Sequence, residues 1–259
     1  MKKILTMGIV ALVLITMSSC QFNLFAAFDK IEIPSVAELE SEASNNPAGF
    51  VSDVEDYIEN NFLESEDVTD AQEQAIIDGL TNIYGGGTSA SPAVKQQAAI
   101  LVGELEITRD PATSAVVNGV IGAVSDALGA SGTIDPEGLV GDIFPTNLDL
   151  AGLQNILNDL DNAAAAYSDL APTLAGNDPG MTSGEVGDMT QLAIVALVIA
   201  DIRSQVSDDT DLLDFITSGG SNTLAVTLTN PFDTTDGGPS LFESDLQDIL
   251  TFAGLDLGI

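Results

Sequence analysis

Apolar residues recur at helical spacing along most of the chain. Val51, Val54 and Ile58 lie three or four residues apart, and similar spacing continues through 68–83, 92–105, 111–128, 150–167, 212–216 and 246–252. Such spacing places the apolar side chains of a segment on one face of an α-helix. The pattern therefore predicts an all-α protein, built either as a helical bundle or as a short array of helical hairpins of HEAT or TPR type.

Capping residues mark where several of these helices begin. Three starts place a proline in the first turn, at Asn46-Pro47, Ser91-Pro92 and Asp110-Pro111, where the missing N–H group is not needed. Two more starts fit the capping box, in which two side chains bond the free N–H groups of the first turn: Thr182 with Glu185 and Ser240 with Glu243. Most connections are short, which favours antiparallel neighbours.

Three segments lack the helical pattern. Residues 130–145 and 171–181 contain glycine and proline and are predicted to be connections. The first of them is also the candidate boundary for a subdivision of the helical domain. Residues 223–229, TLAVTLT, alternate like a strand but have no second strand to pair with, so we expect an extended connector.

The segment Leu192 to Ala200, LAIVALVIA, is apolar on every side. A transmembrane helix needs about 20 apolar residues, which is roughly twice the length of this run. A helix that is apolar all round is normally covered by its neighbours. We therefore predict that this segment belongs to the central core helix of the domain and does not span a membrane.

One predicted helix carries a pattern of small and apolar residues, made up of Pro92, Val94, Lys95, Ala98, Ala99, Val102, Gly103 and Leu105. This pattern resembles the first helix of a HEAT-type repeat, and Asp110-Pro111 falls where the second helix would begin. The resemblance covers one repeat period, whereas a solenoid needs about three repeats to bury its faces. The alternative is a chance likeness within an ordinary pair of helices.

The first twenty residues, MKKILTMGIVALVLITMSSC, have the order of a signal peptide. Lys2 and Lys3 precede an apolar run at 4–17, and small residues lead to Cys20. The segment resembles the signal and lipobox of bacterial lipoproteins, with Met17 where that family usually has leucine. The resemblance implies cleavage before Cys20, which would then carry diacylglycerol and a further acyl chain such as palmitate. An ordinary secretory signal is the alternative.

The organisation that follows is a tether at 21–35 and a single helical domain at 36–259. Phe22, Phe25 and Phe28 recur at every third residue of the tether. They either face the membrane interface or contact the first helices. In some lipoproteins an aspartate after the cysteine favours the inner membrane, so Gln21 implies the outer membrane, facing the periplasm or the cell surface.

Acidic residues outnumber basic ones by 40 to 6, for a formal net charge of -34. Charge of this sign excludes nucleic acid and anionic membrane surfaces as electrostatic partners. Salt screens the repulsion within such a chain, which indicates adaptation to saline surroundings. The alternative is calcium binding. Asp236 and Glu243 match the fifth and twelfth positions of an EF-hand loop, although Phe232 replaces its first ligand.

The chain has no histidine, no tryptophan and one cysteine, Cys20. The commonest general base and the imidazole metal ligands are therefore missing, and no cofactor or metal is predicted. We expect a non-enzymatic, lipid-anchored scaffold of the cell envelope that binds a protein or peptide. Two alternatives are a periplasmic solute-handling lipoprotein with a ligand cavity and a hydrolase that uses paired carboxylates.

Overall fold

The computed structural model describes residues 33–60, 63, 68–130, 136–145, 147–175, 180–218, 224, 228 and 241–255. These residues form ten α-helices and no strand, which confirms the all-α prediction. The helices are α2 (Val36–Asn45), α3 (Pro47–Glu59), α4 (Asp70–Tyr84), α5 (Pro92–Thr108), α6 (Pro111–Ala130), α7 (Pro136–Ile143), α8 (Leu150–Leu174), α9 (Ser183–Gln205), α10 (Asp209–Thr217) and α11 (Leu241–Phe252).

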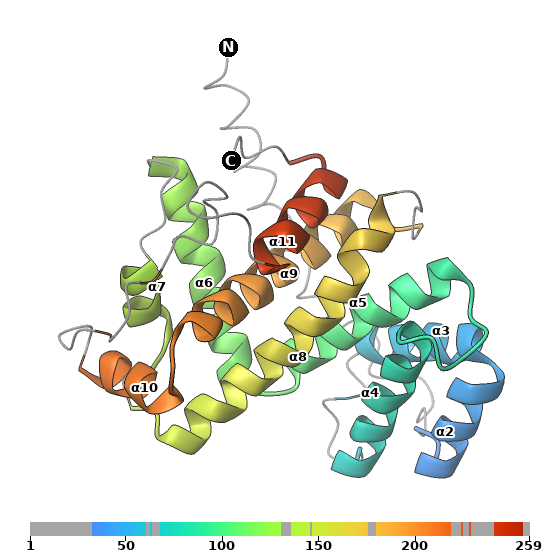
Figure 1. Ribbon diagram of the computed structural model, residues 1–259. Coiled ribbons are helices and arrows are strands. Elements are labelled where there is room, and N and C mark those ends of the chain that lie inside the picture. The colour runs from blue at the N-terminus through green and yellow to red at the C-terminus, as the bar shows by residue number, and fades with distance from the viewer. Residues whose placement is uncertain are drawn as a thin grey trace.

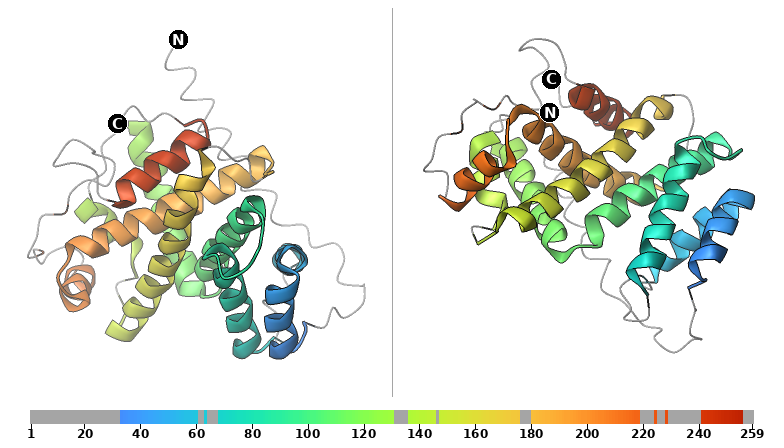
Figure 2. Two further views of the ribbon diagram at one scale, coloured as in Figure 1. Left: turned by 45° about the vertical axis from the view of Figure 1, so that its right-hand side comes forward. Right: turned by 60° about the horizontal axis from the view of Figure 1, so that its bottom comes forward.

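Helix α8 runs through the middle of the molecule (Figure 1). It packs most extensively on α5 and α9, and it also contacts α6, α10 and α11. Helices α2, α3 and α4 gather on one side of it, and α6, α7 and α10 lie on the other (Figures 1 and 2). Because helices distant in sequence pack together, the arrangement is a bundle centred on α8; in a solenoid each repeat contacts only its neighbours.

The segment that resembles a HEAT repeat forms α5 and the start of α6. Only Arg109 and Asp110 separate the two helices, as the proline after Asp110 predicts. Helix α5 nevertheless packs mainly on α8 and α4, and its contact with α6 is smaller. The likeness to a HEAT repeat is therefore one of local sequence, and it does not describe how α5 packs.

The buried apolar residues form two clusters. The N-terminal cluster joins α2, α3, α4 and one face of α5, and the C-terminal cluster joins α6 to α11. Adjacent residues of the shared helices belong to different clusters: Ala98 and Ala166 to the first, Ala99 and Tyr167 to the second. Helices α5 and α8 thus form the wall between the two cores.

Helix α9 is the core helix that the apolar run predicts. Every residue from Val195 to Ala200 is buried, together with Ala193. The helix contacts α5, α6, α8 and α11, so its apolar surface is covered on several sides. Among the described residues, none of the helices combines the length and the apolar character that crossing a membrane requires.

Local capping explains where several helices begin and end. The Asn46 side chain accepts a hydrogen bond from the Gly49 N–H at 3.3 Å, and Thr182 with Glu185 forms the predicted capping box. At the end of α4, Gly86 has a φ of 87°, and the Gly87 N–H bonds the Asn82 carbonyl at 2.9 Å. Such a C-terminal motif needs a left-handed residue, which glycine supplies without strain.

Two predicted connections turn out differently. The range 130–145 contains the helix α7, and Val120 before it and Leu153 after it belong to one apolar cluster. The predicted loop 171–181 begins too early, because α8 continues through Pro172 to Leu174. The buried Gln96 side chain of α5 donates to the Thr173 carbonyl at 3.0 Å, and this tertiary contact holds the last turn in helical form.

The predicted tether and connector are only partly described. Cys20, Gln21 and the three tether phenylalanines lie outside the described residues. Ile33, near the end of the predicted tether, is buried in the N-terminal cluster, and its carbonyl accepts a hydrogen bond from Gln72 at 3.1 Å. Of the connector 223–229, only Leu224 and Leu228 are described; neither is in a helix or strand, and both are buried.

Helices α5 and α8 approach closely where Tyr167 lies over Gly103. A Cβ atom added at Gly103 would come within 2.4 Å of the Tyr167 Cζ atom. Tyr167 is fully buried, and its hydroxyl has no hydrogen-bond partner among the described residues. The ring therefore has little room to move aside, and glycine is the residue that allows this contact.

We predict that Gly103→Ala destabilises the fold by about 1–3 kcal/mol, because overpacking outweighs the better helix propensity of alanine. Gly187→Ala on α9 is the matched control, since an added Cβ there meets nothing within 4 Å. It should raise stability by up to about 1 kcal/mol. Chemical denaturation of both variants tests this, and equal effects would contradict the packing argument.

Candidate functional site

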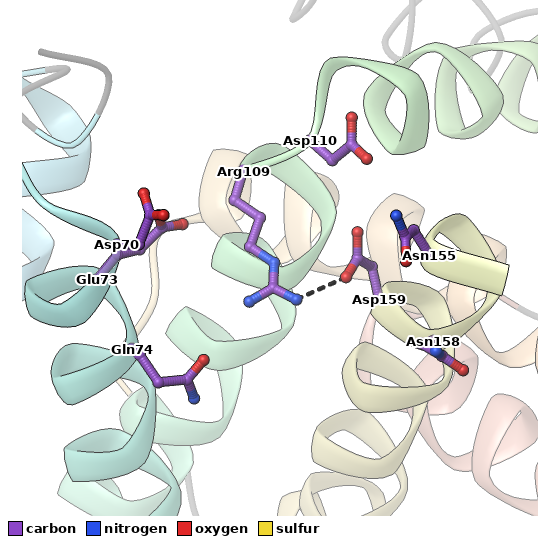
Figure 3. A pocket seen from close by; sticks show the side chains of 8 residues that line it. All are labelled: Asp70, Glu73, Gln74, Arg109, Asp110, Asn155, Asn158 and Asp159. Atoms are coloured by element: carbon purple, nitrogen blue, oxygen red, sulfur yellow. Dashed lines mark hydrogen bonds and ion pairs between the residues drawn. The ribbon is translucent and has the colours of Figure 1, made fainter. Parts of the chain in front are cut away.

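A polar hollow of about 420 Å³ lies between α4 and α8. Its lining comes from three places in the chain (Figure 3): α4 gives Asp70, Glu73 and Gln74, the α5–α6 link gives Arg109 and Asp110, and α8 gives Asn155, Asn158 and Asp159. The first group belongs to the N-terminal side of the molecule and the last to the C-terminal side. The hollow therefore opens at the boundary between the two apolar clusters.

Local structure places these side chains. Thr69 caps α4 through a capping box with Gln72, so Asp70 and Glu73 occupy the first turn, where the free N–H groups favour carboxylates. Asp110 accepts a hydrogen bond from the Ala112 N–H at 2.8 Å and begins α6. On α8, helical spacing brings Asn155, Asn158 and Asp159 to one face.

Arg109 is the central charged group of the hollow. Its Nη2 atom lies 2.6 Å from the Asp159 Oδ1 atom, and Figure 3 shows the guanidinium reaching from the α5–α6 link toward α8. The other Asp159 oxygen accepts a hydrogen bond from the buried Thr113 hydroxyl at 2.9 Å. Asp159 is 5% exposed, so this ion pair joins α5, α6 and α8 in a largely desolvated position.

A second buried acid shares the same arginine. Glu106 Oε2 lies 3.0 Å from Arg109 Nη2 but accepts no hydrogen bond, so the contact is electrostatic only. Burial raises the pKa of Glu106, and the charge of Asp159 adds to the rise, although Arg109 acts in the opposite direction. The charge of Arg109 is thus already balanced by two buried carboxylates.

Glu73 faces the hollow without an ion pair. Burial raises the pKa of Glu73; Arg109 opposes the rise, while Asp70 and Asp159 add to it. Among the described residues, no cation lies within ion-pair distance of Asp70, Glu73 or Asp110. The hollow as a whole is therefore negatively charged.

A second arginine binds the other side of α8. Arg203, near the end of α9, pairs with Asp161 at 2.5 Å and with Asp209 at 2.9 Å. It also donates to the Asn158 side chain at 3.1 Å, which orients one of the residues that line the hollow. The two arginines thus hold the consecutive segment Asn158 to Asp161 from both sides.

The acidic run at 208–211 is a helix start. Asp208 caps α10 by accepting from the Thr210 N–H at 2.8 Å. Asp209 does more than this, because it binds Arg203 through both carboxylate oxygens, at 3.1 and 2.9 Å. Neither this pairing nor the roles of Arg109, Glu73 and Asp159 in the hollow are predicted from the sequence. The scarcity of arginine was the one available signal that each arginine has a structural partner.

Of the candidate site residues Cys20, Asp236 and Glu243, only Glu243 is described, and it is not among the residues that line the hollow. Cys20 and Asp236 lie outside the described residues. Glu243 is in the first turn of α11 and is buried, with 6% of its surface exposed. Within the described part of the chain, no group of three or more acidic side chains is arranged to hold a metal ion.

A second group of acids gathers where α3, α5 and α9 meet. Burial raises the pKa of Glu104 on α5, and the charges of Asp188, Glu55 and Glu59 raise it further. Burial is also the main cause of the raised pKa of Asp188, to which Glu185 adds. No basic residue contributes to either pKa shift. The repulsion between the acidic side chains at this junction is therefore not offset by a positive charge.

The carboxylates of the hollow differ in how they are engaged. Both oxygens of Asp159 are engaged, one by Arg109 and one by Thr113. Within the described part of the chain, no ion pair engages Glu73, whose pKa is raised mainly by burial, or Asp70 beside it in the hollow. What the hollow offers is negative charge with amide groups beside it, which suits a ligand rich in hydrogen-bond donors.

Comparison of the chain with protein families, curated proteins and solved structures finds no match.

We predict that Asp159→Asn lowers stability by about 2–4 kcal/mol, because it breaks a largely buried ion pair and leaves Arg109 beside Glu106 alone. The control is Asp161→Asn. The Asp161 side chain is 42% exposed, and Arg203 keeps Asp209, so the loss should be about 0–1 kcal/mol. Urea denaturation measures both, and a larger loss for Asp161→Asn would contradict the assignment.

We also predict that mild acidification stabilises the protein at low salt. The pKa values of Glu73, Glu104, Glu106, Asp161 and Asp188 are raised, with burial as the leading cause in each case. A carboxyl with a raised folded-state pKa binds its proton more tightly in the folded chain, so stability rises as pH falls toward the unfolded-state pKa.

The free energy of unfolding should therefore be higher at about pH 5.5 than at about pH 7.5. The difference should shrink at about 2 M sodium chloride, which screens the repulsion and raises stability at neutral pH. A loss of stability on mild acidification, or a flat response to salt, would show that carboxylate repulsion is not an important term.

Proposed function

We propose that the chain is a non-enzymatic, lipid-anchored interaction protein of the bacterial cell envelope, which binds a protein or peptide through its acidic helical surface. The anchor rests on the lipobox-like segment that ends at Cys20. The single structural observation that supports the binding role is the open, negatively charged hollow between α4 and α8.

The apolar surface of the described residues is directed inward. Leu150, at 36% exposure, is the one exposed large apolar side chain in the described part of the chain. An apolar helix docked in a hydrophobic groove therefore fits this surface poorly, and a partner with complementary charge fits it well. The partner surface we propose is polar and basic.

The distance between the anchor and the helical body suits a surface-bound role. About 13 residues separate Cys20 from Ile33, and even a fully extended chain of that length spans only about 45 Å. Ile33 itself is buried against α4. The lipid would thus keep the acidic body close to one leaflet, where its partner would also be concentrated.

The solute-handling alternative calls for a ligand cavity. The hollow is open and lined by charged and amide side chains, so a solute held there would be polar and cationic. This alternative shares the site with the proposed function and differs from it in the size of the ligand.

We predict that Cys20→Ala moves the protein from the membrane fraction to the soluble fraction, because the thiol that would carry the lipid is lost. Fractionation followed by immunoblotting measures this, with the wild-type chain and a Gln21→Ala variant as controls. Circular dichroism of the released protein shows whether it remains helical. A Cys20→Ala chain that stays in washed membranes would refute the anchor.

A further inference from the structure

One side chain ties the segment before α2 to the start of α4. The Gln72 amide nitrogen donates to the Ile33 carbonyl at 3.1 Å and to the Pro34 carbonyl at 3.0 Å. The Gln72 side-chain oxygen accepts from the Thr69 N–H at 3.1 Å and from the Thr69 hydroxyl at 2.8 Å. Both ends of this amide are therefore engaged, one by the N-terminal segment and the other by the capping box of α4.

Neighbouring contacts hold the same point of the chain. Ile33 is buried in the N-terminal cluster, and Pro34 favours an extended backbone at the residue before it. Ser35 then begins α2: its carbonyl accepts from the Leu39 N–H at 2.9 Å, and its N–H donates to the Glu38 carboxylate at 2.9 Å. Three successive residues are thus fixed against the first turn of α4.

This attachment lies on one side of the molecule. Helix α11 lies across α8 from α4 (Figures 1 and 2). Helix α8 itself has 25 residues, which corresponds to a length of about 37 Å. The stretch of about 13 residues between Cys20 and Ile33 could span at most about 45 Å, and a random coil of that length spans about 20 Å. A lipid on Cys20 would therefore lie closer on average to the α4 side than to the α11 side.

We propose that Gln72 is a positioning residue that fixes where the lipid-bearing segment leaves the helical body, so that the anchored protein holds its α4 side toward the leaflet and its α11 side away from it. This proposal rests on the lipid anchor of the proposed function, and it adds the orientation of the body. The bonds of Gln72 are between neutral groups, so salt screens them less than it screens the many carboxylates of the surface.

The variant Gln72→Glu tests the attachment. Glutamate keeps a side-chain oxygen for the capping box but lacks the N–H groups that bond the carbonyls of Ile33 and Pro34. Amide hydrogen exchange over residues 33–39 should become about tenfold faster or more, because two hydrogen bonds are lost. The matched control Gln74→Glu adds the same charge at an exposed position of α4 and should change the exchange less than about twofold. Equal exchange in both variants would overturn the role of Gln72.

Energy transfer to the leaflet tests the orientation. The full lipidated protein is placed in phosphatidylcholine vesicles that contain a headgroup-linked acceptor dye. A donor dye is attached through Ala71→Cys on α4 or through Thr251→Cys on α11, both exposed positions. Acylation would occupy the thiol of Cys20, the one native cysteine, so the dye reacts at the introduced position. Transfer from position 71 should exceed that from position 251 at least about twofold, because the width of the bundle separates them. Equal transfer, or more from position 251, contradicts the orientation.

The two measurements distinguish this proposal from the lipid anchor. Hydrogen exchange needs no membrane, so it tests the bonds of Gln72 whether or not Cys20 carries a lipid. Energy transfer keeps Gln72 in place, so it tests the orientation even if Gln72→Glu fails to fold. A protein that binds the vesicles but gives equal transfer from both positions refutes the orientation and leaves the anchor standing. A protein that does not bind the vesicles refutes the anchor, and the orientation is refuted with it.

Discussion

The two arginines of the described helices both bind α8, and the rest of the structure depends on how that helix is held. Arg109 reaches it from the α5–α6 link and Arg203 from the end of α9. Between them they fix the segment from Asn158 to Asp161, around which the two apolar clusters meet. The chain has 6 basic and 40 acidic residues. Because both arginines bind α8, most of the other acidic side chains have no arginine partner, and solvent and salt screen their charge.

The pKa values of the acidic side chains depend on where those side chains lie in the fold. The buried Glu106 and the partly buried Glu104 have raised pKa values, mainly because of burial. The acids at the exposed helix starts behave differently: hydrogen bonds from Ser35 lower the pKa of Glu38, and those from Thr210 lower that of Asp208. The charged form of an acidic side chain is therefore stabilised at a helix cap, whereas it is destabilised where the side chain is buried between helices. The hollow at α4 and α8 is one such junction that remains open to a ligand.

Much of the fold could be predicted from the sequence because its signals are local. Asn46 and Thr182 cap their helices as their neighbours in sequence indicate, and the apolar run in α9 is long enough to identify a core helix. The end of α8 could not be predicted, since Gln96 holds it from 77 residues away. The ion pair of Arg109 with Asp159 spans 50 residues, and no local pattern connects the two. The hollow could not be predicted for the same reason, because its lining comes from α4, the α5–α6 link and α8, which are far apart in the sequence.

The shared wall between the clusters has a consequence for how the chain unfolds. Ala98 and Ala99 face opposite cores from adjacent positions of α5, and Ala166 and Tyr167 do the same from α8. If either apolar cluster unfolded, α5 and α8 would each expose one apolar face to water. Neither cluster therefore has its full set of packing partners without the other. The described helices should therefore unfold in one cooperative transition, although their buried residues form two apolar clusters.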